Sequence, residues 1–338
     1  MLIKDDEELR YVKQFSKGFS FERLADHVAN AERNFLYPLL GKELYSKLAE
    51  YHAGSDFKIK DPFFNADFSG ELFEEVKEDK KQMAYAILLW YSQHAIVHLG
   101  IYLGFDVLNS VSTDAGFKKG NNEHGLFKYQ ENNLKDYYKD TGFNGLDRAL
   151  EIIEMYIDEF TEFKDILTAL KSSIIPDTKT FNGLYYINNS RLIFMRLVPY
   201  METILNLEIA PIMGLDNLQY LKDELKKEEP SAKAKAVLLY VQNPLAYLAT
   251  VSLMEETGAE LTDRGLYFKG MQAGYGGPDV NVPTPVERLL PIINRNRLAA
   301  HNLLDFLRSY MVRSWDGYAP APPGYHNRDN SGKKTFFS

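Results

Sequence analysis

Apolar residues recur at helical spacing along most of the chain. Between positions 21 and 35 they follow one another in steps of three or four, which predicts a helix with one apolar face. They are Phe21, Leu24, Val28, Ala31 and Phe35. Between positions 74 and 103 the sequence is apolar on nearly every side from Met83 onward. That pattern is typical of a helix buried inside its domain.

The same spacing predicts helices at residues 44–51, 126–138, 146–170, 191–207, 215–225, 231–257 and 286–315. Residues 177–189 look irregular instead. Two other stretches, residues 111–120 and 261–270, combine turn residues with short apolar pieces and predict hairpins. We therefore expect an all-α fold that carries two short hairpins or extended arms.

Three sequence landmarks each occur twice along the chain, in the same order in both halves. The first is Pro-apolar-apolar-Gly, at residues 38–41 and again at 211–214, with an offset of 173 that the preceding helix shares. The second is the start of the buried helix, where residues 84–90 match residues 234–240 at an offset of 150. Internal similarity of this kind indicates a repeated structural unit.

The third landmark is Thr-Asp-x-Gly followed by an apolar residue. In the first half it comprises Thr113, Asp114, Gly116 and Phe117. In the second half it comprises Thr262, Asp263 and Gly265, followed by a leucine. An Asp side chain accepts bonds from nearby backbone amides and Gly supplies positive φ, so the motif predicts a hairpin tip. A calcium loop would need several more oxygen ligands at short spacing. We expect these seven residues to lie in an interface.

The three landmarks predict a helical module that is repeated once along the chain. The first copy spans residues 1–172 and the second, shorter copy spans residues 173–315. The offset falls from 173 at the first landmark to 150 at the second, because the first copy has a longer loop than the second. The insertion most naturally lies at residues 53–69.

Residues 316–338 form a C-terminal segment of different character. Pro320, Pro322 and Pro323 favour an extended chain, and the segment ends in Phe336 and Phe337. Two interpretations stay open: a disordered surface tail, or an arm that docks on a neighbouring subunit. The second explains the terminal aromatic pair, and we add three of its residues to the predicted interface: Tyr325, Phe336 and Phe337.

Positive charge concentrates on the last predicted helix, against an acidic remainder. Arg308 and Arg313 belong to this group, which could face a phosphate backbone. We favour an interface in which they balance acidic neighbours.

Composition narrows the class of protein. The chain has 338 residues, 45% of them hydrophobic and 25% charged, which is typical of a soluble globular protein. A net charge of −8 argues against a nucleic-acid-binding surface that covers the whole chain. Without cysteine, neither a disulfide nor a cysteine metal site is possible. No secretory signal or membrane span is expected.

Candidate catalytic chemistry is sparse. His94 and His98 have the i,i+4 spacing of two zinc ligands, but Ala95 stands where a zincin needs its Glu. Glu151, Glu154 and Asp158 make a carboxylate stripe without the histidines of a di-iron site. We interpret the histidines as core or interface residues and the carboxylates as a solvated face. No enzyme activity, cofactor or metal is expected.

The first 170 residues resemble phage head–tail connector proteins, especially those of crAss-like phages that infect Bacteroidetes. The resemblance lies in the acidic start, in residues 31–45 (AERNFLYPLLGKELY), and in the turn at residues 112–117. It extends more faintly to the second copy.

The resemblance implies a structural virion protein in the neck, with each copy a connector-like helical bundle. It further implies a homo-oligomeric ring, usually of twelve subunits, which is assembled in the host cytoplasm. Such a ring lies between the portal protein and further neck or tail ring proteins, and DNA passes through it. The size departs from the family, because ordinary members hold one module.

Two alternatives stay open at this point. One is a helical scaffold or adaptor protein with no phage role. The other is an all-α enzyme with His94, His98 and the carboxylates in a cleft.

Overall fold

The computed structural model describes residues 1–15, 19–54, 80–108, 110–113, 116–119, 128–161, 163, 174–257, 260–262, 265–267 and 286–315. The chain divides into two compact units, Met1–Leu167 and Thr168–Ser338, which we call unit 1 and unit 2. The predicted boundary between residues 172 and 173 lies five residues further along the chain.

Unit 1 contains helices and one hairpin. In chain order they are α1 (Asp6–Val12), α2 (Glu22–Ala31), a π-helical turn η1 (Glu32–Leu36), α3 (Tyr37–Gly54), α5 (Lys80–Leu108), β1 (Ser110–Thr113), β2 (Gly116–Lys119) and α6 (Lys128–Met155). The strands β1 and β2 pair antiparallel.

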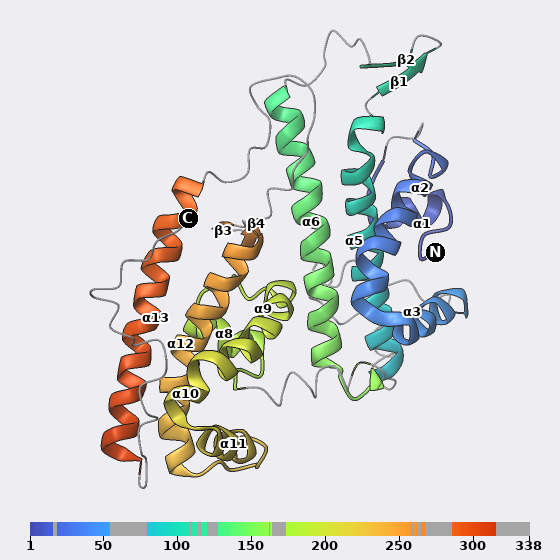
Figure 1. Ribbon diagram of the computed structural model, residues 1–338. Helices are drawn as coiled ribbons and strands as arrows, with labels where there is room; N and C mark the ends of the chain where they lie inside the picture. The colour runs from blue at the N-terminus through green and yellow to red at the C-terminus, as the bar shows by residue number, and fades with distance from the viewer. Residues whose placement is uncertain are drawn as a thin grey trace, which may run out of the picture. The chain divides into compact units, whose positions relative to one another are not determined.

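Helix α5 is the centre of unit 1, packed between α2 and α6 (Figure 1). Glycines bring these helices close together. A Cβ atom on Gly100 would lie 2.9 Å from the Val28 side chain of α2, and one on Gly145 of α6 would lie 3.0 Å from the Ala95 Cα. Small residues at these crossings therefore allow α5 to be buried almost all round.

In chain order, the elements of unit 2 are α8 (Thr178–Leu184), α9 (Arg191–Ile204), η2 (Leu205–Ile209), α10 (Ala210–Met213), α11 (Leu215–Glu224), α12 (Ala232–Thr257), β3 (Glu260–Thr262), β4 (Gly265–Tyr267) and α13 (Val286–Ser314). They repeat the order of unit 1, with two helices, α10 and α11, in the place of the kinked α3. Helix α12 takes the central place, with α9 and α13 packed against it. Their buried faces form one apolar core with α8, α10 and α11.

Backbone features repeat at the offset of the first landmark. The π-helical turns η1 and η2 are both five residues long and begin 173 positions apart. Gly41 and Gly214, also 173 apart, have φ of 73° and 85°. Each π-helical turn is followed by a kink at the glycine. A residue with a side chain would be strained at this positive φ, so Gly is required there. We interpret the two units as copies of one module.

The all-α prediction is confirmed, and two short hairpins accompany the helices. The hairpins occur where the Thr-Asp-x-Gly motifs predicted turns: Thr113 pairs with Gly116, and Thr262 with Gly265.

Several boundaries were predicted wrongly. Residues 126–138 and 146–170 were expected as two helices, but α6 runs without a break through Gly142 and Gly145. Both glycines lie in close contact with α5. The helices α1 and α8 were not predicted, because seven residues are too few for a clear apolar period.

Candidate functional site

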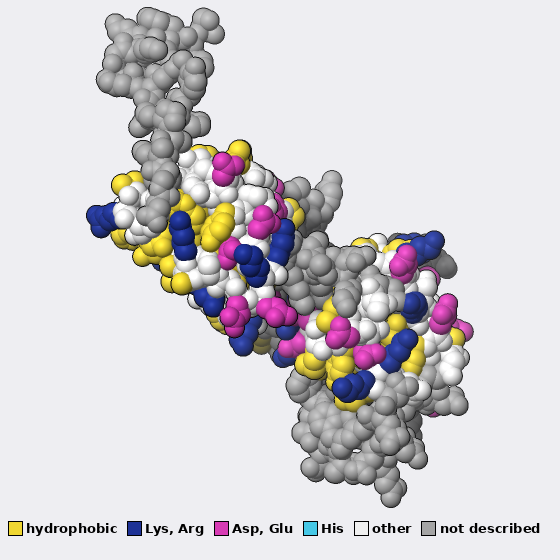
Figure 2. All heavy atoms as spheres, turned by 90° about the horizontal axis from the view of Figure 1, so that it is seen from below, with side chains coloured by type: hydrophobic (Ala, Val, Ile, Leu, Met, Phe, Trp, Pro, Cys, Tyr) yellow, Lys and Arg dark blue, Asp and Glu magenta, His cyan; other side chains and the backbone are white. Residues whose placement is uncertain are grey.

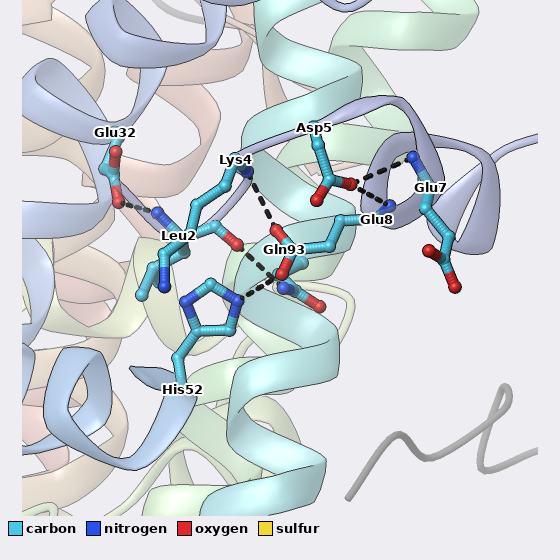
Figure 3. A network of polar contacts seen from close by, with 8 residues as sticks. All are labelled: Leu2, Lys4, Asp5, Glu7, Glu8, Glu32, His52 and Gln93. Atoms are coloured by element: carbon cyan, nitrogen blue, oxygen red, sulfur yellow. Dashed lines mark hydrogen bonds and ion pairs between the residues drawn. The ribbon is translucent and has the colours of Figure 1, made fainter. Parts of the chain in front are cut away.

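The start of unit 1 is held by a network of polar contacts (Figure 3). The backbone N–H of Leu2 donates to Glu32 Oε1 at 2.8 Å, and Gln93 Nε2 of α5 donates to the carbonyl of Leu2 at 2.7 Å. Asp5 caps α1 by accepting from two backbone amides of its first turn. Leu2, Ile3 and Leu9 are thereby fixed in the core, all of them at most 1% exposed.

Unit 2 begins with two of these contacts. Gln242 Nε2 of α12 donates to the carbonyl of Ile174 at 2.8 Å, and Asp177 caps α8 by accepting from the amide of Thr180. Phe181 is fully buried, 172 positions after Leu9. We call residues 2–12 and 174–184 the opening segments of the two units. Each puts a short capped helix against the central helix and fixes it with a buried glutamine.

Sequence reasoning missed these opening segments. Their signal is present: two large apolar residues, any residue, then Asp before a short helix, as in Leu2-Ile3-Lys4-Asp5 and Ile174-Ile175-Pro176-Asp177. Gln93 and Gln242 lie 149 positions apart, the same offset as Thr113 and Thr262. An internal comparison at an offset of 149 would have found the glutamines, and one at an offset of 172 would have found the opening segments.

The predicted interface residues of the hairpins lie in matching places. Each hairpin follows the central helix of its unit directly, and β1 contacts the end of α5. Thr113, Gly116, Phe117, Thr262 and Gly265 are strand residues. The two aspartates between the paired strands lie outside the described residues: Asp114 and Asp263.

The remaining predicted interface residues lie at the C-terminal end of the chain. Arg308 forms an ion pair with Asp305 at 2.6 Å on the exposed side of α13, and Arg313 is exposed one turn later. Both therefore lie on the surface. Three other residues lie outside the described residues: Tyr325, Phe336 and Phe337.

An apolar surface lies at the end of unit 2 where α12 begins and α13 ends. Figure 2 shows hydrophobic side chains gathered at this end of the unit. Leu239 is 60% exposed and Tyr240 is 40% exposed. The Tyr240 ring stacks on the Tyr310 ring of α13 with centroids 4.6 Å apart.

Trp315, the last described residue, anchors the same end of unit 2. Its indole N–H donates to Asn217 Oδ1 at 2.9 Å. Its ring contacts the Tyr220 ring, and the ammonium of Lys233 lies 4.0 Å from its centroid. The side chains of α11, α12 and α13 thus meet at Trp315.

The two histidines, predicted as core or interface residues, lie in the interior of unit 1, where His98 is buried and His94 is partly buried. The rings of His94 and His98 are 4.2 Å apart, and His94 stacks on Trp90. Burial of His98, together with the nearby His94 and Lys13, lowers its pKa to about 3. The ring is therefore neutral at physiological pH.

The carboxylate stripe does not gather into a metal site in the described part of the chain. Glu151 forms an ion pair with Arg148, and Glu154 and Asp158 also have partners. Within the described ranges, no group of three or more His, Asp or Glu side chains could hold a metal ion.

Two helices are long and apolar enough to cross a membrane by length and composition alone. They are residues Lys80–Leu108 and Ala232–Glu256, and 83% and 61% of their most apolar windows are buried. Central helices of globular units pass the same test, so this is weak evidence for a membrane span.

No curated protein and no solved structure matches the chain significantly. One family matches residues 36–169, nearly all of which lie in unit 1, and residues 209–323 in unit 2. The two matches together make up more than half of the chain. The chain therefore belongs to the family of unknown function DUF6712.

Proposed function

We propose that this protein is a structural component of a phage neck. In this proposal, copies of the chain form a ring between the portal protein and further neck or tail proteins, and the ring surrounds the DNA passage. The observation that carries the proposal is the repetition of one module, each copy with a hairpin at the end of its central helix. Two similar surfaces on one chain suit a protein that bridges successive layers of an assembly.

The resemblance to connector proteins supports this role. Its longest stretch, residues 31–45, covers the π-helical turn η1, the kink at Gly41 and the start of α3. The same turn and kink recur in unit 2 at η2 and Gly214. The resemblance therefore involves a backbone corner that both units share, rather than a surface motif of one of them.

The hairpins support a role in assembly. In the described part of the chain each sheet has two strands, and neither sheet gains a third strand from its own unit. An isolated two-stranded hairpin is marginally stable in water. Contacts with a neighbouring subunit or a partner ring would supply the missing stabilisation, and strand edges are common sites for such contacts.

The charge of the chain suits a DNA passage. Proteins bind DNA through cationic groups that release counterions. A net charge of −8 disfavours such binding, so DNA could slide past the wall of the ring without being held.

The test is to look for the protein in assembled particles. Particles from cells that produce a tagged chain during infection would be purified and analysed by mass spectrometry and electron microscopy. We expect the chain in portal-containing particles, in a ring at the vertex that joins the tail. Gly116→Pro, which should disrupt the first hairpin, would lower incorporation more than Gly54→Ala at the end of α3.

Two outcomes would contradict the proposal. A protein that stays monomeric and never joins a portal-containing particle is not a neck ring. A protein that self-associates but is absent from every such particle would instead be a helical scaffold with another partner.

A further inference from the structure

The apolar surface of α12 is exposed at positions that are buried in unit 1. Its members Ala236, Leu239 and Tyr240 lie on one side of the helix at steps of three and one. We call these three residues the α12 stripe. Gln93 and Gln242, which make matching contacts from the two central helices, set the offset at 149. At this offset the counterparts on α5 are Ile87, Trp90 and Tyr91, which are 5%, 8% and 6% exposed.

This difference is larger than the ordinary exposure of single apolar residues. Isolated exposed leucines are common on protein surfaces and need no explanation. Here the matching sides of the two central helices differ: the side is buried on α5 and exposed on α12. The exposed side lies next to the stacked rings of Tyr240 and Tyr310. The stripe therefore lacks a cover that its counterpart in unit 1 has.

In unit 1 the residues that follow the last long helix pack back on the start of the central helix, which shows that this part of a unit can contact that helix. There Phe160 is fully buried and packs on Tyr85 with ring centroids 5.0 Å apart. In unit 2 the residues that follow the last long helix are residues 316–338. They contain four aromatic residues: Tyr318, Tyr325, Phe336 and Phe337.

The C-terminal segment leaves the described structure beside the α12 stripe. Trp315 contacts Lys233 in the first turn of α12. Tyr240 stacks on Tyr310, five residues before Trp315. A handful of residues would therefore be enough to return from Trp315 to the stripe of the same molecule.

The terminal aromatic pair is much further along the chain than that. Phe336 follows Trp315 by 21 positions, a length that spans up to roughly 70 Å when extended. Pro320, Pro322 and Pro323 stiffen the first part of this segment and favour an extended chain, which opposes an early return. The chain length therefore allows the pair to reach a neighbouring molecule.

We propose that the α12 stripe binds the Phe336–Phe337 end of the C-terminal segment of a second copy of the chain. Two phenylalanine rings would cover Leu239 and the free face of Tyr240, and apolar burial on both sides would drive the contact. The contact joins two different surfaces, so it is heterologous and would propagate until a ring closes. It adds a specific contact to the ring proposed above but does not depend on a place in a virion.

The test uses full-length protein and measures its mass in solution by analytical ultracentrifugation over a range of concentrations. Leu239→Asp alters the stripe, and Phe336→Ser with Phe337→Ser alters the segment. The matched control is Leu298→Asp, because Leu298 is 65% exposed on α13 and lies away from the stripe in sequence. Circular dichroism would show that all variants keep their helices.

We expect the wild-type protein and the Leu298→Asp control to form assemblies larger than dimers. The stripe variant and the segment variant alone should each associate at least tenfold more weakly. Mixed in equal amounts, they should form a one-to-one pair, because one molecule supplies an intact stripe and the other an intact segment.

Two results would overturn the inference. In the first, both variants associate like the wild type. In the second, the wild type stays monomeric, as expected if the segment covers the stripe of its own molecule. Neither result would bear on the neck proposal, which is tested separately in particles. Conversely, a protein whose variants associate as expected here but which is absent from particles would support this inference and contradict the neck proposal.

Discussion

The two opening segments are anchored by the same contacts but surrounded by different side chains. In both units an Asp caps a seven-residue helix, a large apolar residue enters the core, and a buried glutamine bonds to a backbone carbonyl. Around these shared contacts, polar pairs of unit 1 are replaced in unit 2.

Glu32 and Tyr45 show the replacement most clearly. In unit 1 the Tyr45 hydroxyl donates to Glu32 Oε1 at 2.9 Å, and both burial and this carboxylate raise the tyrosine pKa. At the offset of 173 the counterparts are Leu205 and Leu218, both buried in the core of unit 2. A polar pair has become an apolar pair.

The contact between Lys4 and Glu8 is replaced in the same way. In unit 1 the backbone N–H of Lys4 donates to Glu8 Oε2 at 2.8 Å. In unit 2 the counterparts at the offset of 172 are Pro176, which has no N–H, and Thr180, which has no carboxylate. For a pair with a buried member, such as Glu32 with Tyr45, removing one partner is costly, whereas replacing both can be nearly neutral. The two units therefore differ by whole interactions rather than by single residues.

The largest effect should come from the apolar anchors that the units share. Leu9→Ala in unit 1 should cost about 2–5 kcal/mol and Phe181→Ala in unit 2 about 3–5 kcal/mol, because each leaves a cavity in a packed core. Urea unfolding combined with hydrogen exchange would assign each loss to its unit. Leu207→Ala, at a residue 68% exposed on η2, should change the stability little. A loss below 0.5 kcal/mol for either anchor would show that its opening segment is not part of the core.

A smaller effect should appear in how the stability of the two units depends on pH. The pKa of His98 is about 3 in the folded protein and about 6.5 when unfolded, so below pH 6.5 the unfolded state takes up a proton that the folded state does not. Stability is therefore complete above pH 6.5 and is lost as the pH falls toward 3, by about 2 kcal/mol at pH 5.

The variant His98→Tyr tests this pH dependence, because Tyr247 occupies the matching position of α12 at the offset of 149. Urea unfolding at pH 7 and pH 5 should show a fall in stability about 2 kcal/mol smaller for the variant than for the wild type. An equal fall in both proteins would mean that His98 is not buried in a neutral form.

The replacement of Glu32 and Tyr45 can be tested by giving unit 1 the residues of unit 2. Glu32→Leu alone should cost about 1–3 kcal/mol, because the Tyr45 hydroxyl and the Leu2 amide lose their acceptor. Adding Tyr45→Leu should recover part of that loss. The double variant should therefore lose less stability than the sum of the losses of the two single variants. Additive losses in this double-mutant cycle would show that the two residues do not interact.

The smallest effect should come from the close crossing of α2 and α5. Gly100→Ala should cost about 1–2 kcal/mol, because the added Cβ would lie 2.9 Å from Val28 and outweigh the better helix propensity of Ala. Gly183→Ala in α8 is the control: nothing lies within 4 Å of its Cβ position, so the variant should be neutral or slightly more stable. Thermal unfolding of both variants would decide this, and a stabilised Gly100→Ala would mean a looser crossing.

Much of the fold could be predicted from the sequence, because long apolar periods mark the helices α2, α5, α9, α12 and α13 clearly. The hairpins followed from Thr-Asp-x-Gly, a motif with a direct backbone reason. The continuity of α6 could not be predicted, since Gly142 and Gly145 look like helix breakers until their contacts with α5 are known.

The candidate site was predictable only in part. The hairpin residues were found from their motif, but the α12 stripe was not, because its sequence resembles that of α5 and only the structure shows the difference in burial. The glutamines Gln93 and Gln242 also went unnoticed. A single buried polar residue in an apolar helix has no periodic signal, and its role depends on a carbonyl far away in sequence.

The central claim is that the two units are copies of one module, and an experimental structure of the full-length protein tests it most directly. The account predicts that the units superimpose element by element. Gln93 and Gln242 should then bond to the carbonyls of Leu2 and Ile174, and Gly41 and Gly214 should both have positive φ after a π-helical turn. Units that share their helix order but lack these paired contacts would contradict the claim, because helix order alone recurs in unrelated bundles.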